Sequence, residues 1–412
     1  MTATLTTPPA TVPAHRDPDV RRWLAAYTSS MLGDNVYYIA LSWAAVRSGT
    51  PAQVGLVMSA SALPRAVLML GGGVVADRFG PRRVVIGSDA VRCAAVLAVA
   101  ALLFLTSPGL VPLALLALVF GAVDAVFVPA VGALPARLTG KDQLGRVQGM
   151  RGLAIRFAAV AGAPLGGLGV ATGGACAAFA LAGLLIAVSV PLLLSVRVRD
   201  LPKEPGAAAG TAWSDLRAGL HHIRRHRVLA PLMLAIALGD LGFVGPLNVG
   251  LTLLSDRRGW GASGMGWVLA GFGVGAGAAS LLLAVRGRLA RAGLVAGWTI
   301  IVGSVAVGAL AYAPTLVAAV GTAVLVGLLT GLSGAMCGAL LQTLTGPAYL
   351  GRVTAVSSLI SLGLTPLSMP FAAAAIGAWG LAPVYVVSAA VCGLGGVVAL
   401  AVPALRRAEL PG

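Results

Sequence analysis

Charged residues are scarce in this sequence. Asp, Glu, Lys and Arg together make up 10% of the 412 residues, against about a quarter in an ordinary soluble domain. Acidic residues are the scarcest of these, with 13 Asp and Glu against 29 Lys and Arg. Hydrophobic residues, by contrast, make up 58% of the chain. A soluble protein cannot bury this much apolar surface, so we predict an integral membrane protein.

Residues that build metal sites, disulfides and catalytic centres are also few. The four cysteines lie singly in apolar segments without paired spacing and are interpreted as small hydrophobic residues. Three of the four histidines share one short segment that offers no carboxylate on the same helix face. No G-x-x-x-x-G-K-[S/T] phosphate loop is present. We therefore predict no metal, no cofactor and no catalytic residue, and a protein that is not an enzyme.

Long apolar runs dominate what remains. Each run is near the ~20 residues that a helix needs to cross about 30 Å of hydrocarbon. They are too long for the ~10-residue alternating segments of a membrane β-barrel. We predict twelve transmembrane helices, at residues 23–46, 52–76, 84–106, 112–136, 150–171, 174–196, 229–254, 263–285, 291–312, 315–341, 353–375 and 380–404.

The positive charges are distributed asymmetrically along this predicted topology. Of the 29 Lys and Arg, 22 fall in the two terminal segments and the even-numbered loops, and only three fall in the opposite loops. This is the asymmetry of the positive-inside rule, and it places both termini in the cytoplasm. The net charge of +16 is thus explained by orientation in a cell (plasma or inner) membrane, with the lipid bilayer as partner, and predicts no nucleic-acid binding.

The sequence repeats itself at an offset of half its length. LTGKDQLGRV at 138–147 returns as LTGPAYLGRV at 344–353, and ten of sixteen positions match between 132–147 and 338–353. Leu-Gly-Asp at 32–34 returns at 238–240 by the same offset. Six spans per copy preserve orientation, so we predict two parallel six-helix bundles related by pseudo-symmetry. The predicted units are residues 1–196, a cytoplasmic linker with an amphipathic helix at 197–228, and residues 229–412.

The loop between the second and third spans carries a recognisable motif. GGGVVADRFGPRRVV contains Gly73, Asp77, Arg78, Gly80, Arg82 and Arg83 in a G-x-x-x-D-R-x-G-x-R-R pattern. With twelve spans and a central loop, the chain resembles the major facilitator superfamily. Gly33-Asp34, Ala76-Asp77-Arg78, Asp89-x-x-Arg92 and the LGRV segment further resemble its drug:proton antiporter branch, which contains macrolide and siderophore exporters.

The resemblance implies a helical transporter that works by alternating access. It also implies that the loop motif, together with Asp89 and Arg92, forms a latch between the halves; the alternative is that these residues only anchor the topology. The equivalent loop in the second half, at 281–293, has three arginines but no acid. A related Gly/Pro motif of antiporters reads GAPLGG at 162–167, with its proline one place late, and we interpret it as helix packing.

Ionisable residues within the predicted spans mark candidate functional sites, because a charge at bilayer depth costs at least about 2.5–3.5 kcal/mol. Burial favours the neutral form of a carboxylate, which allows a proton to be taken up and released. We propose Asp34 as the proton-coupling residue, since the first span lines the cavity in the family it resembles. Asp124 is the second candidate, and Asp240, the repeat partner of Asp34, is the third.

Two arginines, Arg65 and Arg156, also lie inside spans. We predict that Arg156 pairs with Asp124 and Arg65 with Asp34, either as functional or as purely structural ion pairs. Tyr37 and Tyr38, one turn beyond Asp34, are candidates for an aromatic wall of the substrate cavity; the alternative, which the sequence favours, is core or interfacial packing.

Together these features predict a proton-coupled efflux antiporter for a small lipophilic or amphipathic compound such as a drug, antibiotic or secondary metabolite. We expect its partners to be this small-molecule substrate and protons, and we expect it to act as a monomer. Two alternatives remain open. One is uptake or exchange of a metabolite, siderophore or lipid on the same scaffold; the other is a sensor or scaffold that transports nothing.

Overall fold

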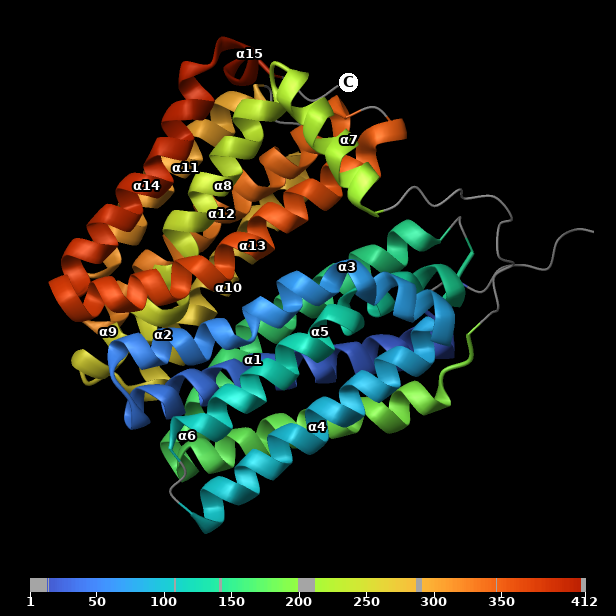
Figure 1. Cartoon of the computed structure of the whole chain (residues 1–412), viewed down its shortest axis with the longest axis vertical. Helices are drawn as coiled ribbons and strands as arrows, with labels where there is room; N and C mark the ends of the chain where they lie inside the picture. The colour runs from blue at the N-terminus through green and yellow to red at the C-terminus, as the bar shows by residue number, and fades with distance from the viewer. Residues whose placement is uncertain are drawn as a thin grey trace, which may run out of the picture.

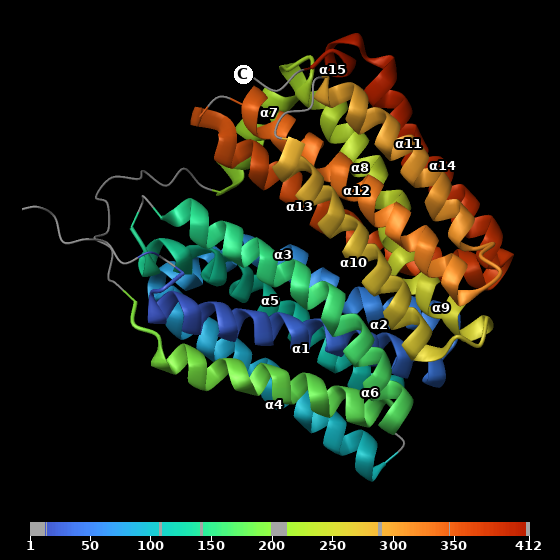
Figure 2. The same ribbon diagram turned by 180° about the vertical axis from the view of Figure 1, so that it is seen from behind.

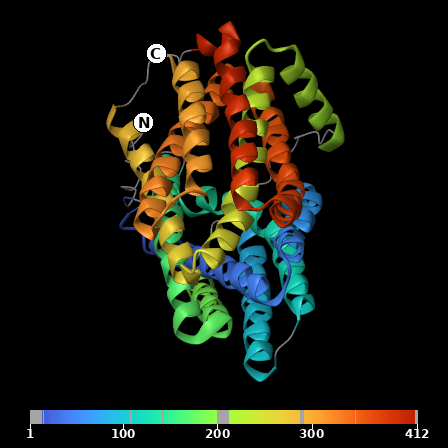
Figure 3. The same ribbon diagram turned by 90° about the vertical axis from the view of Figure 1, so that its left-hand side faces the viewer.

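A computed structural model describes residues 13, 15–106, 109–140, 143–198, 212–286, 291–345 and 347–408, and helices make up nearly all of them (Figure 1). The helices form two groups, one before and one after the short helix α7 (Ala212–Arg225). Figure 3, turned by a quarter, shows the same two groups stacked one above the other. They are called the first and second bundles below.

The first bundle consists of α1 (Pro18–Ser48), α2 (Pro51–Ala60), α3 (Ala62–Phe79), α4 (Pro81–Leu105), α5 (Leu110–Leu138) and α6 (Leu144–Ser195). α2 and α3 are one span interrupted at Ser61, because Pro64 has no N–H to bond the carbonyl four residues earlier. α6 is two antiparallel spans joined at Gly173 and Gly174. Gly174 has φ +70°, a backbone conformation that is strained for any residue with a Cβ and that glycine adopts readily.

The second bundle consists of α8 (Leu229–Gly245), η1 (Pro246–Gly250), α9 (Leu251–Arg257), α10 (Gly261–Arg286), α11 (Ala292–Leu310), α12 (Leu316–Leu344), α13 (Pro347–Trp379), α14 (Leu381–Ala401) and α15 (Pro403–Arg406). α8, the π-helical turn η1 and α9 form one continuous rod. Its central turn begins at Pro246, the kind of residue that displaces the regular hydrogen-bond ladder.

Eight helical segments of the described chain are long and apolar enough to cross a membrane, and one of them, in α6, comprises two of the predicted spans. α1, the α2–α3 rod and α13 supply the other three predicted spans. The predicted all-helical membrane fold, with twelve spans in two bundles, is confirmed. Most helices extend a few residues beyond the predicted boundaries, because their polar ends continue past the apolar run.

Close helix contacts within and between bundles depend on glycine. A Cβ on Gly275 would lie 2.0 Å from the carbonyl oxygen of Val324, and one on Gly327 would lie 2.0 Å from that of Phe272. α10 and α12 can therefore touch backbone to backbone, which a side chain would prevent. The glycine-rich run at 271–277 is thus a packing surface.

The bundles meet at the end farthest from α7 and diverge toward the end where α7 lies (Figures 1 and 2). At the meeting end α2 packs on α13 and α6 packs on α10. Gly55 faces Ala373, and Gly266 faces the carbonyl of Ala163 in the GAPLGG segment. The predicted packing role of that segment is confirmed. The two bundles thus contact each other at one end and separate toward the other.

The linker helix α7 docks on the second bundle. Its Gly219 lies against the carbonyl of Arg352, and Ile223 is buried in a cluster formed with α8, α12 and α13. The ring of His222 stacks on Tyr349 with centroids 4.4 Å apart. The sequence predicted an amphipathic helix on the membrane surface; in the structure its buried face packs on protein.

We predict that acid weakens the junction between α7 and α8. His226 Nδ1 accepts hydrogen bonds from the backbone N–H groups of Val228 (3.3 Å) and Leu229 (3.2 Å), which caps α8. Partial burial and the neighbouring His222 lower the pKa of His226. A lowered pKa means that this stabilisation is complete above the ordinary value of about 6.5 and is lost as pH falls through the folded value. Protonated Nδ1 is a donor and cannot cap.

Acidification from pH 8 to pH 5 should therefore lower the melting temperature by about 1–2 °C through this contact, the scale of one exposed cap. His226→Asn keeps a capping oxygen that does not titrate and should remove this part of the pH dependence. His221→Asn, at an exposed position of α7, is the matched control. Equal pH profiles for the wild type and His226→Asn would contradict the prediction.

Candidate functional site

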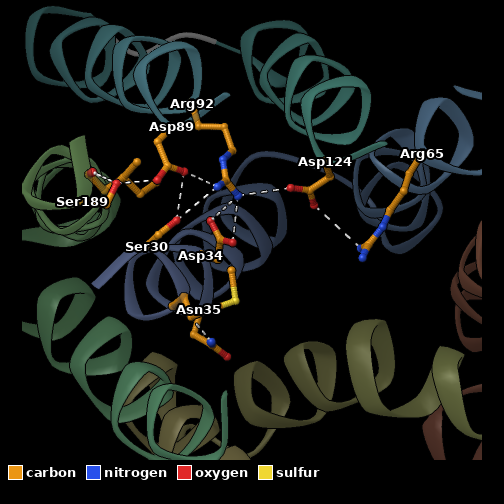
Figure 4. Close-up of polar contacts among 10 residues, drawn as sticks. Ser30, Asp34, Asn35, Arg65, Asp89, Arg92, Asp124 and Ser189 are labelled. Atoms are coloured by element: carbon orange, nitrogen blue, oxygen red, sulfur yellow. Dashed lines mark hydrogen bonds and ion pairs between the residues drawn. The ribbon is translucent and has the colours of Figure 1, made fainter. Parts of the chain in front are cut away.

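A cluster of charged side chains lies inside the first bundle (Figure 4). α1 supplies Asp34, α3 supplies Arg65, α4 supplies Asp89 and Arg92, and α5 supplies Asp124. These five residues are called the charge cluster below. The five residues come from four helices, so the packing of these helices brings them together.

Arg92 is the centre of the charge cluster, and its side chain is completely buried. Nη1 donates to both carboxylate oxygens of Asp34, at 2.9 and 3.0 Å, and to Asp124 at 3.2 Å. Nη2 donates to Asp89 on the same helix. The Phe127 ring lies 3.9 Å from the guanidinium carbon, a cation–π contact. Only arginine presents enough donors in one plane for three carboxylates.

Asp89 holds this guanidinium from one helical turn away. It also accepts hydrogen bonds from Ser30, at 3.0 Å, and from Ser189, and it is completely buried. A carboxylate that accepts from one guanidinium and two hydroxyls is held in one orientation. We therefore interpret Asp89 as the structural member of the charge cluster, which fixes the position of Arg92.

Asp124 is shared between two arginines. Its Oδ1 lies 3.2 Å from Arg92 and its Oδ2 lies 3.8 Å from Arg65. The side chain of Arg65 is about one third exposed, whereas that of Arg92 is fully buried. Arg65 follows Pro64, at the start of α3 just after the break from α2, so the interruption of that span sets where this second guanidinium lies.

The charge cluster carries more negative than positive charge. Three carboxylates face two guanidinium groups, which leaves a net charge of −1 when all are ionised. In the described chain Asp34 has one ion-pair partner, Arg92, which also pairs with Asp89 and Asp124. Asp124 has two ion-pair partners, Arg92 and Arg65. Uptake of one proton by one of the three carboxylates would make the charge cluster neutral.

The predicted pairs of arginine and aspartate differ from the observed ones. Arg65 pairs with Asp124, whereas the sequence paired it with Asp34, and Arg156 forms no ion pair with Asp124 within the described chain. The physical reason is Arg92, which the sequence analysis assigned, with Asp89, to the latch; in the structure both lie in the charge cluster. Arg92 lies 11 residues after the start of α4, about 16 Å along the helix at 1.5 Å per residue, and occupies the space between both aspartates.

The two candidate tyrosines point in different directions. Tyr37 is completely buried and stacks on Phe120, with ring centroids 3.7 Å apart, so it belongs to the core and does not line the cavity. Tyr38 lines a cavity of about 240 Å³ between the bundles, together with Arg156 and Asn248. Of the aromatic wall predicted from the sequence, only Tyr38 faces a cavity.

A larger cavity, of about 560 Å³, opens in the second bundle. Asp240 of α8 lines it, and this carboxylate accepts a hydrogen bond from Ser361. Arg156 lines the same cavity from α6 of the first bundle. Within the described residues neither side chain forms an ion pair. The cavity therefore carries one acid and one base from opposite bundles.

The second bundle lacks a copy of the charge cluster. Asp34 is repeated as Asp240, but at the same offset of 206 Arg65, Asp89, Arg92 and Asp124 are replaced by Gly271, Val295, Trp298 and Thr330. The duplicated fold therefore has a charged centre in one bundle and a cavity with a single carboxylate in the other.

The loop motif extends from the last turns of α3 through Gly80 to the first turn of α4. Gly80 has φ +84°, which explains its glycine, and Arg82 donates to the carbonyls of Leu193 (3.2 Å) and Leu194 (2.7 Å) in its own bundle. Arg78 and Arg83 are exposed. Gly73 lies within α3, and the side chain of Asp77 is not among those that the structure describes. The latch between the halves stays a prediction.

Sequence reasoning missed several partners of the acids. Ser30 and Ser189 bind Asp89, and Ser361 binds Asp240. A serine in a membrane helix usually bonds its own backbone, and nothing in its local sequence marks the exceptions. Arg92 could have been placed by counting residues from the start of its span.

Comparisons with known proteins agree with this fold. The model of the Major Facilitator Superfamily matches residues 23–362. The sequence is 26% identical over 342 residues to the enterobactin exporter EntS of Shigella boydii serotype 18, covering 80% of each chain. The structure is similar to that of the nucleoside transporter NupG (TM-score 0.72, 14% identity, 95% of this chain and 100% of that one). It is also similar to a bacterial homologue of the human lysosomal transporter Spinster (TM-score 0.70, 13% identity, 94% and 95%).

Proposed function

Because the chain belongs to the Major Facilitator Superfamily, and is thus a multi-pass membrane transporter and not an enzyme, we propose that it exports a small lipophilic or amphipathic compound in exchange for protons. The observation that carries the proton coupling is the net charge of −1 in the charge cluster. Such a charge at bilayer depth is costly, and a single proton removes it. The likeness to an enterobactin exporter supports export as the direction.

The duplicated architecture supports alternating access. We propose that residues 1–196 and 229–412 move as two units joined by the linker at 197–228. The charge asymmetry of the loops supports cytoplasmic termini in a cell membrane. With that orientation, bundles that meet far from α7 and diverge beside it correspond to a transporter open to the cytoplasm (Figure 2). The motif around Gly80 and Arg82 would then close that side in the opposite state.

The energy of proton entry is sufficient for useful export. One charge that moves down a potential of 100 mV releases about 2.3 kcal/mol, equivalent to a roughly fifty-fold concentration gradient. The 560 Å³ cavity has the volume typical of sites for drug-sized ligands. Its lining combines aromatic rings, such as those of Phe243 and Phe272, with a few polar side chains, which suits an amphipathic compound.

Export can be tested in a bacterial host that lacks its major drug pumps. Cells that express the chain should accumulate several-fold less of at least one compound from a panel of toxic amphipathic molecules than cells with an empty vector. A protonophore should raise accumulation to the level of the empty vector, because the exchange needs a proton gradient. If no compound differs between the two strains, the proposal of export fails. If accumulation rises instead, the chain is an uptake transporter.

A further inference from the structure

The 560 Å³ cavity holds two opposite charges that nothing in the described chain neutralises. Asp240 receives one hydrogen bond from Ser361, and Arg156 forms none that the structure records. Every other described acid that lies deep in a span is paired with an arginine, as Asp34 and Asp124 are. Unpaired charges at bilayer depth are costly, and they usually mark a site whose partner comes from outside the protein.

The hydroxyl groups that line the cavity with Asp240 have oxygen atoms that can accept hydrogen bonds from a ligand. Ser280, Ser304, Thr330 and Ser333 line the cavity, and each donates its own hydrogen to a carbonyl of its helix. The oxygens of these hydroxyls keep their lone pairs. Each can therefore accept a further hydrogen bond, but it could donate one only by giving up its bond to the helix carbonyl. A carboxylate among such acceptors favours a ligand group rich in N–H or O–H donors, above all an ammonium group.

Arg156 supplies the complementary part. It projects from α6 of the first bundle, whereas the acid and the hydroxyls belong to the second. Arg156 also lines the smaller cavity between the bundles, beside Tyr38 and Asn35. A ligand with a single charge would pair with either Asp240 or Arg156 and leave the other side chain without a partner when the site is closed and water is excluded. A ligand with both charges neutralises both and links the two bundles.

We propose that the transported compound is zwitterionic, with its ammonium group bound by Asp240 and its anionic group bound by Arg156. This inference rests on the proposed transport function and specifies its substrate class. A purely anionic compound would meet the carboxylate of Asp240 without a counter-ion, and a purely cationic one would leave Arg156 unpaired. Simultaneous contact with both bundles gives the substrate a direct effect on the closure of the cavity.

The test uses one scaffold in four charge states. Norfloxacin is a zwitterion; its ethyl ester is a cation, its N-acetyl derivative an anion, and its N-acetyl ethyl ester is neutral. Dissociation constants are measured by titration calorimetry with the full-length chain in lipid nanodiscs. The zwitterion should bind most tightly, and each single blocking step should weaken binding about 10- to 100-fold, the effect of losing one hydrogen bond between charged groups.

Two variants assign the charges to residues. In Asp240→Asn, acetylation of the amine should no longer weaken binding, and in Arg156→Gln, esterification should no longer weaken it. Asp256→Asn and Arg257→Gln, both exposed at the end of α9, are matched controls and should retain the wild-type pattern. If a variant fails to fold, the four charge states still decide the question with the wild type.

Equal binding of all four forms to the wild type, or binding of none, would overturn the inference. So would a wild-type pattern that survives in both cavity variants. These outcomes are distinct from failure of the proposed function. If a pump-deficient host shows proton-dependent export of other compounds while the four forms bind equally, export stands and the zwitterion does not. If no compound is exported, the proposed function itself fails.

Discussion

Replacing Arg92 with glutamine is expected to prevent the accumulation of folded protein. The substitution removes the single guanidinium that contacts Asp34, Asp89 and Asp124 together, and it changes the net charge of the charge cluster from −1 to −2. Removal of one partner from a buried ion pair costs about 3–5 kcal/mol, a large part of the 5–15 kcal/mol that stabilises a typical protein. The yield of monodisperse protein in size-exclusion chromatography should fall at least several-fold.

The same argument predicts a partial rescue. Asp34→Asn added to Arg92→Gln returns the net charge to −1 and should recover part of the yield. Arg83→Gln removes an exposed arginine from the first turns of the same helix and should leave the yield unchanged, because exposed charges contribute little to stability. If Arg92→Gln gives wild-type yield and melting temperature, the charge cluster does not stabilise the bundle as we describe.

Replacing Asp34 with asparagine is expected to uncouple transport from protons while the protein stays folded. Asparagine has the shape and charge of a protonated aspartate, so the charge cluster becomes permanently neutral. The variant should still equilibrate substrate down its gradient, but a pH or potential gradient should no longer drive accumulation. Since one charge at 100 mV supports a roughly fifty-fold gradient, the substrate gradient should fall from tens-fold to about one.

The measurement compares substrate accumulation with and without a proton gradient in proteoliposomes, for the wild type, Asp34→Asn and Asp124→Asn. Asp124 contacts both Arg92 and Arg65, so its loss should reduce the rate and leave part of the gradient. Asp89→Asn should reduce yield before it affects coupling, because that carboxylate is completely buried and binds two serines. Full gradient-driven accumulation by Asp34→Asn would refute Asp34 as the proton site.

Much of the candidate site was accessible from sequence because charge at bilayer depth is rare. Asp34, Asp124, Asp240, Arg65 and Arg156 stand out within apolar runs, and in the structure each lies in the charge cluster or lines a cavity. Their pairing was not accessible. Which arginine faces which aspartate depends on the rotation of each helix about its axis and on the choice of neighbouring helices, and no local pattern encodes these for helices that are apolar on most sides.

The differences between the two halves were also only partly predictable from the sequence repeat. The offset of 206 residues predicted two similar bundles, and the structure contains them. The mismatches at that offset, such as Asp124 against Thr330, showed that the halves differ. Only the packed structure showed how they differ, with a charge cluster in the first bundle and an open cavity in the second.

The sequence by itself determined the membrane fold, its spans, its duplication and the identity of the charged residues inside it. Those features follow from composition, the length of apolar runs and repetition, which are properties of the chain alone. Tertiary structure decided that Asp34 pairs with Arg92 and not with Arg65. It also decided that Tyr37 is buried in the core while Tyr38 lines a cavity. Finally, it placed Arg156 and Asp240 on the lining of one cavity. These facts depend on distances between helices far apart in sequence, and such distances are fixed only when the helices pack.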